Sequence, residues 1–134
     1  MSQSVETITL SHGPAPIGPY SHAACVGDFI TLAGTAGVDP ASGQLAGNDT
    51  YSQARQILAN FVVMLAAAGS DLDHVMHINV FMKQVEDFDA MNRAYVEALG
   101  EHRPTRTVIG VHALPKPGAL LTMDLTAVKR KPTA

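Results

Sequence analysis

The sequence predicts a single α+β domain spanning residues 1–134, in which a mixed β-sheet carries two helices packed on one face. Three observations support this class. The chain of 134 residues has the usual length of one domain, and it contains no internal repeat. Apolar residues recur at helical spacing in two segments and at strand spacing in several others. Strands and helices alternate too few times for a doubly wound parallel sheet.

The first third of the chain is predicted to form strands and loops. Residues 5–10 mix polar and apolar side chains at strand spacing, and a loop rich in glycine and proline follows them. The β-prone runs 23–26 and 29–33 flank a Gly-Asp dipeptide, an arrangement that is typical of a β-hairpin. Residues 37–47, which contain glycine, proline and serine, are expected to form the next loop.

Two helices are predicted, and each has a start signal and a stop signal. Residues 50–53 read Thr-Tyr-Ser-Gln, which has the spacing of a capping box, and Gly69 ends the helical pattern that follows. The acidic cluster at 86–89 suits the start of a second helix, and Gly100 ends it. The apolar stripe of this second helix consists of Phe88, Met91, Tyr95 and Leu99.

The second half of the sheet is predicted from residues 74–83, 105–114 and 119–128. In 74–83 the period changes to two, so that alternate side chains point to opposite faces. One face is apolar and fits a core. The other face is mildly polar, which favours burial in a subunit interface over full exposure to water. Its residues include His77, Asn79, Phe81, Thr122 and Thr126.

Composition excludes several classes of protein. Charged residues make up 16% of the chain and its formal charge is −3, so a broad basic surface for nucleic acid is missing. So few charges leave much neutral surface, which favours an oligomer. Cys25 is the only cysteine, so a disulfide framework is excluded and a cytoplasmic location is expected. The sequence predicts neither a secretory leader nor a membrane span.

The six histidines do not predict a metal site. His74 and His77 are three residues apart on a predicted strand, so they are expected to point to opposite faces. The other histidines are scattered without a paired spacing. No Gly-x-Ser-x-Gly sequence is present to carry a serine nucleophile.

Two polar residues on predicted elements require partners. Asn92 lies within the apolar stripe of the second helix, and its amide is expected to bond a neighbouring loop or, less simply, a ligand. Arg106 shares a strand face with Val108, Gly110 and His112, so its guanidinium needs an anion. An internal Asp or Glu and a bound carboxylate or phosphate are equally compatible with this spacing.

Four segments of the chain resemble the RidA (YjgF) family of enamine/imine deaminases. They are 17–23 (IGPYSHA), 30–43 ending in VDPASG, 80–99 around Asp-Phe and Asn92, and 103–106 (RPTR) followed by a Leu-Pro pair. The resemblance runs from about residue 13 to residue 128. It implies a chorismate-mutase-like subunit, a homotrimer with active sites in the clefts between subunits, and no metal or organic cofactor.

The resemblance also implies roles for individual residues. Arg106 matches the arginine that holds the carboxylate of a 2-imino, 2-enamino or 2-oxo acid, and Tyr20 and Asn92 match positions in the cleft. Backbone groups near Gly34 and Val108 would orient the reacting end of the substrate.

Three positions depart from the pattern of the active members of that family. Ala33, Val108 and Thr122 stand where those members have a serine, a cysteine and a glutamate. Threonine does not ionise near neutral pH and cannot act as a carboxylate base. Asp124 lies two residues further along the same strand face as Thr122, and it is the alternative candidate for this role.

Three functions compete at this point. The first is hydrolysis of reactive enamines or imines to 2-oxo acids and ammonia. The second is a trimeric protein that binds or senses small carboxylates with weak or no catalysis, which the threonine at position 122 favours. The third is RNA cleavage, which the acidic balance of the chain disfavours.

Overall fold

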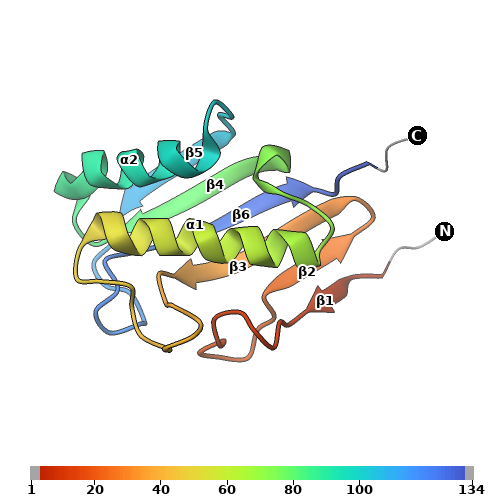
Figure 1. The fold of residues 1–134 in the computed structure, drawn as a ribbon, viewed down its shortest axis with the longest axis horizontal. Coiled ribbons are helices and arrows are strands. Elements are labelled where there is room, and N and C mark those ends of the chain that lie inside the picture. Colours follow the sequence, from red (N-terminus) through yellow and green to blue (C-terminus); the bar gives the residue numbers. More distant parts are fainter. Residues whose placement is uncertain (1–3, 132–134) are drawn as a thin grey trace.

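The computed structural model describes residues 4–131, and it confirms the predicted α+β class. A six-stranded sheet carries helix α1 (Thr50–Ala67) and helix α2 (Phe88–Leu99) on the same face (Figure 1). Two short 3-10 helices, η1 (Leu72–His74) and η2 (Val85–Asp87), precede β4 and α2. The strands are β1 (Glu6–Ile8), β2 (Ala23–Val26), β3 (Phe29–Ala36), β4 (Val75–Met82), β5 (Thr105–Gly110) and β6 (Leu121–Val128).

The order of strands across the sheet is β1-β2-β3-β6-β4-β5. Strands β4 and β5 are parallel because α2 connects them as a crossover, and the other neighbours are antiparallel. The last strand, β6, therefore lies between β3 and β4 and does not pair with β5. This placement makes β5 an edge strand, with Arg106 on it.

The core lies between the sheet and the two helices. On β4 the alternation predicted from the sequence is confirmed from Ile78 onward, since Ile78, Val80 and Met82 are fully buried beneath the helices. Met76 departs from it and is exposed, because the register shifts between Val75 and His77. The opposite face has no helix over it among residues 4–131 (Figure 1). It exposes large apolar side chains, among them Phe29, which is 56% exposed, and Ile109, which is 46% exposed. We call it the open face.

The start of α1 differs from the predicted capping box. Asp49 is the N-cap, and its carboxylate accepts a hydrogen bond from the backbone N–H of Ser52 at 2.8 Å. Thr50 is already helical, and its hydroxyl donates to the carboxylate of Asp87 at 2.9 Å. The cap moves by one residue because an ionised carboxylate is at least as good an acceptor for the free N–H groups as a threonine hydroxyl.

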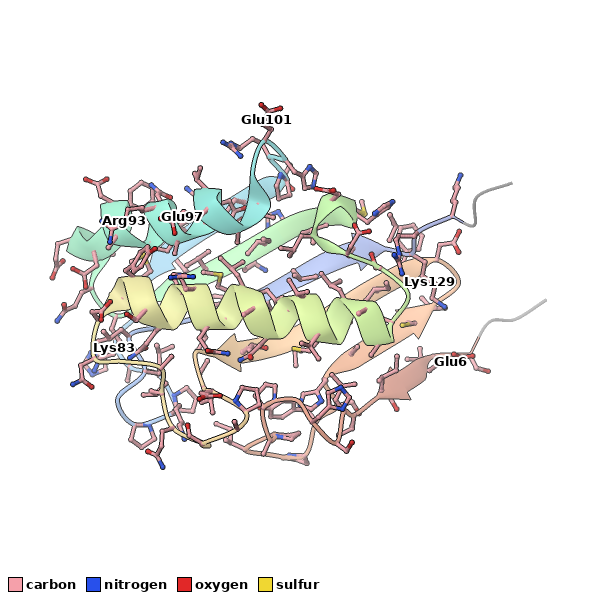
Figure 2. The ribbon with its side chains drawn as sticks, viewed as in Figure 1. Glu6, Lys83, Arg93, Glu97, Glu101 and Lys129 are labelled. Carbon is pink, nitrogen blue, oxygen red and sulfur yellow. The ribbon has the colours of Figure 1, made fainter. Side chains whose placement is uncertain are left out.

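The outer surfaces of the two helices meet through Tyr51. Its hydroxyl donates to the Glu97 carboxylate at 2.5 Å, and the Arg93 guanidinium lies 4.1 Å from the centre of its ring. Figure 2 shows Arg93 and Glu97 together on α2, beside the beginning of α1. These contacts join the polar faces of α1 and α2 above the core.

Several predicted strands are shorter in the structure. The strand predicted at 5–10 covers only Glu6–Ile8, and the strand predicted at 105–114 ends at Gly110. Residues 111–120 form a loop with two prolines, which cannot donate backbone hydrogen bonds to a sheet. Strand β3 extends beyond its predicted end to Ala36, with a register shift between Leu32 and Thr35.

Candidate functional site

The predicted site residues fall into two groups within one chain. Arg106 and Val108 on β5 lie on the face of the sheet that the helices cover, and Arg106 contacts Asn92 on α2. Tyr20, Gly34 and Thr122 line a cavity at the end of β3 and the start of β6. Asp124 is not in the lining of that cavity, although it lies on the same strand as Thr122.

Arg106 is half-buried between β5 and α2. Its register with Ile78 on β4 points its side chain toward the helices. One guanidinium nitrogen, Nη1, donates to Asn92 Oδ1 at 2.8 Å. The guanidinium also lies 4.7 Å from the ring centre of Tyr95 and 5.5 Å from that of Phe88. An amide and two aromatic faces therefore hold the guanidinium in place.

The charge of Arg106 is not neutralised within the described chain. The ion pairs of residues 4–131 join Asp71 to His74 and to Arg130, and neither involves Arg106. Asn92, expected to bond a neighbouring loop or a ligand, bonds Arg106 instead, and an amide carries no charge. Of the two anions compatible with the sequence, the internal carboxylate is thus missing from residues 4–131.

Tyr95 adds a second unused group beside Arg106. The residue is only 4% exposed, and its buried hydroxyl has no hydrogen-bond partner within residues 4–131. Burial raises the pKa of this hydroxyl above 10.0, and the positive charge of Arg106 opposes that rise. The hydroxyl therefore keeps its proton near neutral pH and is a donor without an acceptor.

The cavity has a volume of about 530 Å³ and lies among four segments. They are the loop before β2, the end of β3, the loop before β6 and the start of β6. Most of its wall is apolar, and Lys116 is the only Lys, Arg, Asp or Glu in the lining. The lining residues are Pro14, Ala15, Ile17, Tyr20, His22, Ala33, Gly34, Thr35, Ala36, Val38, Pro115, Lys116 and Thr122.

His22 fixes the loop that forms one wall of the cavity. The residue is 3% exposed, and its Nδ1 accepts a hydrogen bond from the backbone N–H of Leu10 at 2.8 Å. Its Nε2 donates to the carbonyl of Pro14. This pattern requires the neutral ring with the proton on Nε2. No pattern in the sequence indicates this role, because histidines joined to backbone groups have no characteristic spacing.

Gln53 fixes the loop before β6, which carries the lining residues Pro115 and Lys116. Its side chain is fully buried, with Nε2 donating to the carbonyls of Gly47 and Gly118 at 2.9 and 3.2 Å. Its Oε1 accepts from the N–H of Leu120 at 2.8 Å. The residue predicted to close a capping box thus ties the loop carrying Lys116 to the start of α1. The shape of this part of the cavity wall is therefore set by buried hydrogen bonds as well as by packing.

Asp124 belongs to a row of hydrogen bonds across the open face. Asn79 Nδ2 donates to Asp124 Oδ1 at 2.8 Å, and Asn79 Oδ1 lies 2.9 Å from Nε2 of His77. The other ring nitrogen of His77 lies 2.8 Å from the hydroxyl of Thr105. Asp124 is therefore oriented by a neighbouring amide, and one of its carboxylate oxygens is already engaged.

Arg106 and Thr122 do not share a site within one chain. Ile109, Phe81 and Thr122 are aligned across β5, β4 and β6, and Arg106 lies three residues from Ile109. Two strand spacings of about 4.8 Å and three residues of about 3.3 Å separate their Cα atoms by roughly 14 Å. Their side chains also point to opposite faces, since Phe81 and Thr122 alternate with buried neighbours.

Residues 4–131 contain neither a metal-binding cluster nor a membrane-spanning helix. No cluster of three or more His, Cys, Asp or Glu side chains there could hold a metal ion. Within the same residues, no helix combines the length and the apolar character needed to cross a bilayer.

Comparisons with known proteins show which proteins the chain is similar to. The family described as Endoribonuclease L-PSP matches residues 10–129. A RutC family protein of Pyrococcus horikoshii is 39% identical over 92% of this chain and 98% of its own length. The goat 2-iminobutanoate/2-iminopropanoate deaminase is 40% identical over 83% of this chain and 81% of its own. The crystal structure of the Escherichia coli YjgF gene product superposes with a TM-score of 0.86 at 32% identity, covering 93% of this chain and 99% of that one.

Proposed function

The chain belongs to the RidA/YjgF/L-PSP family, and on this basis we propose that it hydrolyses 2-imino and 2-enamino acids to 2-oxo acids and ammonia. The observation that carries the proposal is the Arg106 guanidinium, which is positioned by Asn92 and without an ion-pair partner in residues 4–131. Two relatives, 40% and 34% identical to this chain, are named 2-iminobutanoate/2-iminopropanoate deaminases, which supports the same reaction.

Arg106 has the chemistry needed to hold a small carboxylate. A guanidinium presents five N–H donors in a planar fork, and within residues 4–131 only Nη1 is engaged, by Asn92 at 2.8 Å and by the sulfur of Met91 at 4.0 Å. The remaining donors suit the two oxygens of a carboxylate. The ring of Tyr95 lies against the same guanidinium, and its buried hydroxyl has no hydrogen-bond partner within residues 4–131.

We propose a homotrimer in which Arg106 of one subunit faces the cavity of its neighbour. One chain places Arg106 and Thr122 on opposite faces of the sheet, so a shared site requires a second copy. The open face supports this assembly, because it exposes Phe29 and Ile109 and has no helix over it in the described residues. Light scattering tests the assembly, and a mass equal to that of one chain would contradict it.

The proposed reaction needs water and two proton transfers. Water adds to the imine carbon, a proton moves to the nitrogen, and the tetrahedral intermediate collapses to the 2-oxo acid with loss of ammonia. Arg106 fixes the carboxylate, and backbone groups near Gly34 and Val108 orient the imine. Asp124, oriented by Asn79, is the candidate acceptor for the proton of water, since Thr122 cannot ionise.

The test measures hydrolysis of 2-iminopropanoate and 2-iminobutanoate generated in the assay, with RNA cleavage measured on the same preparation. We expect faster loss of imine than in a protein-free blank, and a large drop in Arg106→Lys. A rate equal to the blank would reject the deaminase. RNA cleavage that survives Arg106→Lys would assign the chain to RNA instead, against its charge of −3.

A carboxylate-binding protein with little catalysis is the second candidate. The observation that favours it is Thr122, which places a neutral hydroxyl in the cavity lining where a carboxylate base would assist hydrolysis. Calorimetry separates the two functions. Binding of 2-oxobutanoate without imine turnover would support the second.

A further inference from the structure

The row of hydrogen bonds across the open face has a fixed direction. The Thr105 hydroxyl donates to the carbonyl of Met76 at 2.9 Å, so its oxygen accepts from Nδ1 of His77 at 2.8 Å. At the other end Asn79 Nδ2 donates to the Asp124 carboxylate at 2.8 Å. Asn79 therefore presents its amide oxygen, which can only accept, to Nε2 of His77 at 2.9 Å. Both ring nitrogens of His77 must donate.

A histidine with two donating nitrogens carries a positive charge. The row then joins a cation at His77 to an anion at Asp124 through the amide of Asn79, with no net charge. Loss of the His77 proton would leave one ring nitrogen facing an oxygen without a hydrogen between them. Turning the Asn79 amide would repair that contact and set its oxygen against the carboxylate instead. The row is therefore complete only when it holds this proton.

His77 and Asp124 are the only titratable side chains that the described strands β1–β6 place on the open face. The residues in register with them are threonine, asparagine, alanine, valine, phenylalanine and isoleucine. Glu6 lies on the other face, opposite the buried Cys25. The open face of a second copy would add only the same two groups.

Other charged groups lie in the turns before β4 and β5. His74 bonds Asp71 at 2.7 Å, and both precede β4. In the loop before β5, His102 and Arg103 donate to backbone carbonyls. Figure 2 shows Glu101 at the tip of that loop, pointing away from the sheet. The charge that compensates His77 on its own face is thus that of Asp124.

We propose that this row links subunit assembly to pH, because the open face is covered only when His77 is protonated. The inference rests on the homotrimer proposed above, in which a neighbour covers this face. In a free subunit, water bonds to a group of the row that has lost its partner. A covered face offers no such water, and an unmatched polar group or an uncompensated carboxylate there is costly.

Assembly should therefore tighten as the pH falls. Assembled subunits keep the His77 proton, whereas free subunits release it as the pH rises through the range of histidine, from about pH 6 to about pH 8. The association constant should fall by up to about tenfold per row for each pH unit in which free subunits lose the proton.

Asp124→Asn allows the row to be completed without a charge. The new amide can donate to Asn79 Oδ1, and Asn79 Nδ2 can then donate to Nε2 of a neutral His77. This variant should assemble as tightly at about pH 8 as at about pH 6, the two ends of the histidine range. His77→Gln removes the titrating ring and should also remove the pH dependence. His74→Gln is the matched control, because it changes a histidine outside the six strands.

Sedimentation velocity of the full chain, over a range of concentrations and across this pH range, measures the association constant. We expect assembly of the wild type and of His74→Gln to weaken as the pH rises, and assembly of Asp124→Asn and His77→Gln to stay constant. Nitrogen chemical shifts of isotope-labelled histidine should show both ring protons on His77 in the assembled wild type. Circular dichroism confirms that each variant is folded.

The outcomes separate this inference from the proposals on which it rests. Wild-type assembly that is equally tight across the range, or a neutral His77 ring in the assembly, would overturn the inference and leave the homotrimer intact. A pH dependence that persists in both Asp124→Asn and His77→Gln would place the titrating group elsewhere and also overturn it. A mass equal to that of one chain at every pH would overturn the assembly together with the inference, and imine hydrolysis would be decided by its own assay.

Discussion

The substitution Arg106→Lys tests the central feature of the site because it keeps the charge and removes the fork. The guanidinium bonds Asn92 through Nη1, while its other nitrogens have no partner in the part of the chain that the structure describes, and it lies 4.7 Å from the ring centre of Tyr95. An ammonium group is a compact donor that cannot bind Asn92 and both oxygens of a carboxylate in the same plane. The variant therefore loses at least one charge-assisted hydrogen bond to the ligand.

The size of the effect follows from that loss. A hydrogen bond to a charged group contributes about 1.5–3 kcal/mol. This corresponds to an affinity lower by about tenfold to about 150-fold. The fold should lose much less, because Arg106 makes no ion pair in the described chain and its bond to Asn92 is to a neutral amide. We expect a loss of about 1 kcal/mol, or a melting temperature lower by about 4 °C.

Calorimetry with 2-oxobutanoate measures the affinity, and thermal unfolding measures the fold. Arg103→Lys is the matched control, since Arg103 is an exposed arginine nearby that donates to the carbonyls of Gly100 and His102. The control should bind like the wild type. Unchanged affinity in Arg106→Lys would show that this residue is structural. Loss of cooperative unfolding would show that it stabilises the fold through a partner within the protein.

Three further predictions concern catalysis, the helix cap and the buried tyrosine. We expect slow wild-type hydrolysis of small imines and a partial gain in Thr122→Glu, because a positioned carboxylate contributes about 10²- to 10⁴-fold; rapid wild-type turnover that disappears in Asp124→Asn would assign the role to Asp124. Asp49→Ala should lower stability by about 1 kcal/mol at neutral pH. Hydrogen bonds from Ser52 lower the pKa of Asp49 below 3.8. The stability contributed by the charged cap is therefore present above that value and is lost as pH falls through the folded pKa. The melting temperatures of wild type and Asp49→Asn should converge in acid. Tyr95→Phe keeps the ring over Arg106 and removes an unpartnered hydroxyl, so its melting temperature should not fall, whereas a fall in thermal melts would reveal a hidden partner.

The fold was predictable where a local pattern decides it. The period of two in β4 and the apolar stripe of α2 are set by burial against one surface, and both can be read from the sequence. The position of β6 between β3 and β4 depends on pairing between distant segments, which no local period encodes. Gln53 shows the same limit, because its partners at Gly47, Gly118 and Leu120 include residues far away in the sequence.

The site, like the fold, was predictable from the sequence only where the pattern along a single strand or helix decides it. The sequence identifies Arg106 as a cation in need of an anion, and alternation relates it to Val108 on its own strand. Alternation along one strand does not show which residues of two different strands share a face, because that depends on the register in which the strands pair. The observed register places Arg106 and Thr122 on opposite faces, with roughly 14 Å between their Cα atoms, and a small imino acid cannot reach both in one chain. Carboxylate binding at Arg106 therefore needs only one subunit's residues, whereas a reaction that uses both groups needs two subunits, so hydrolysis should fall on dilution before carboxylate binding does.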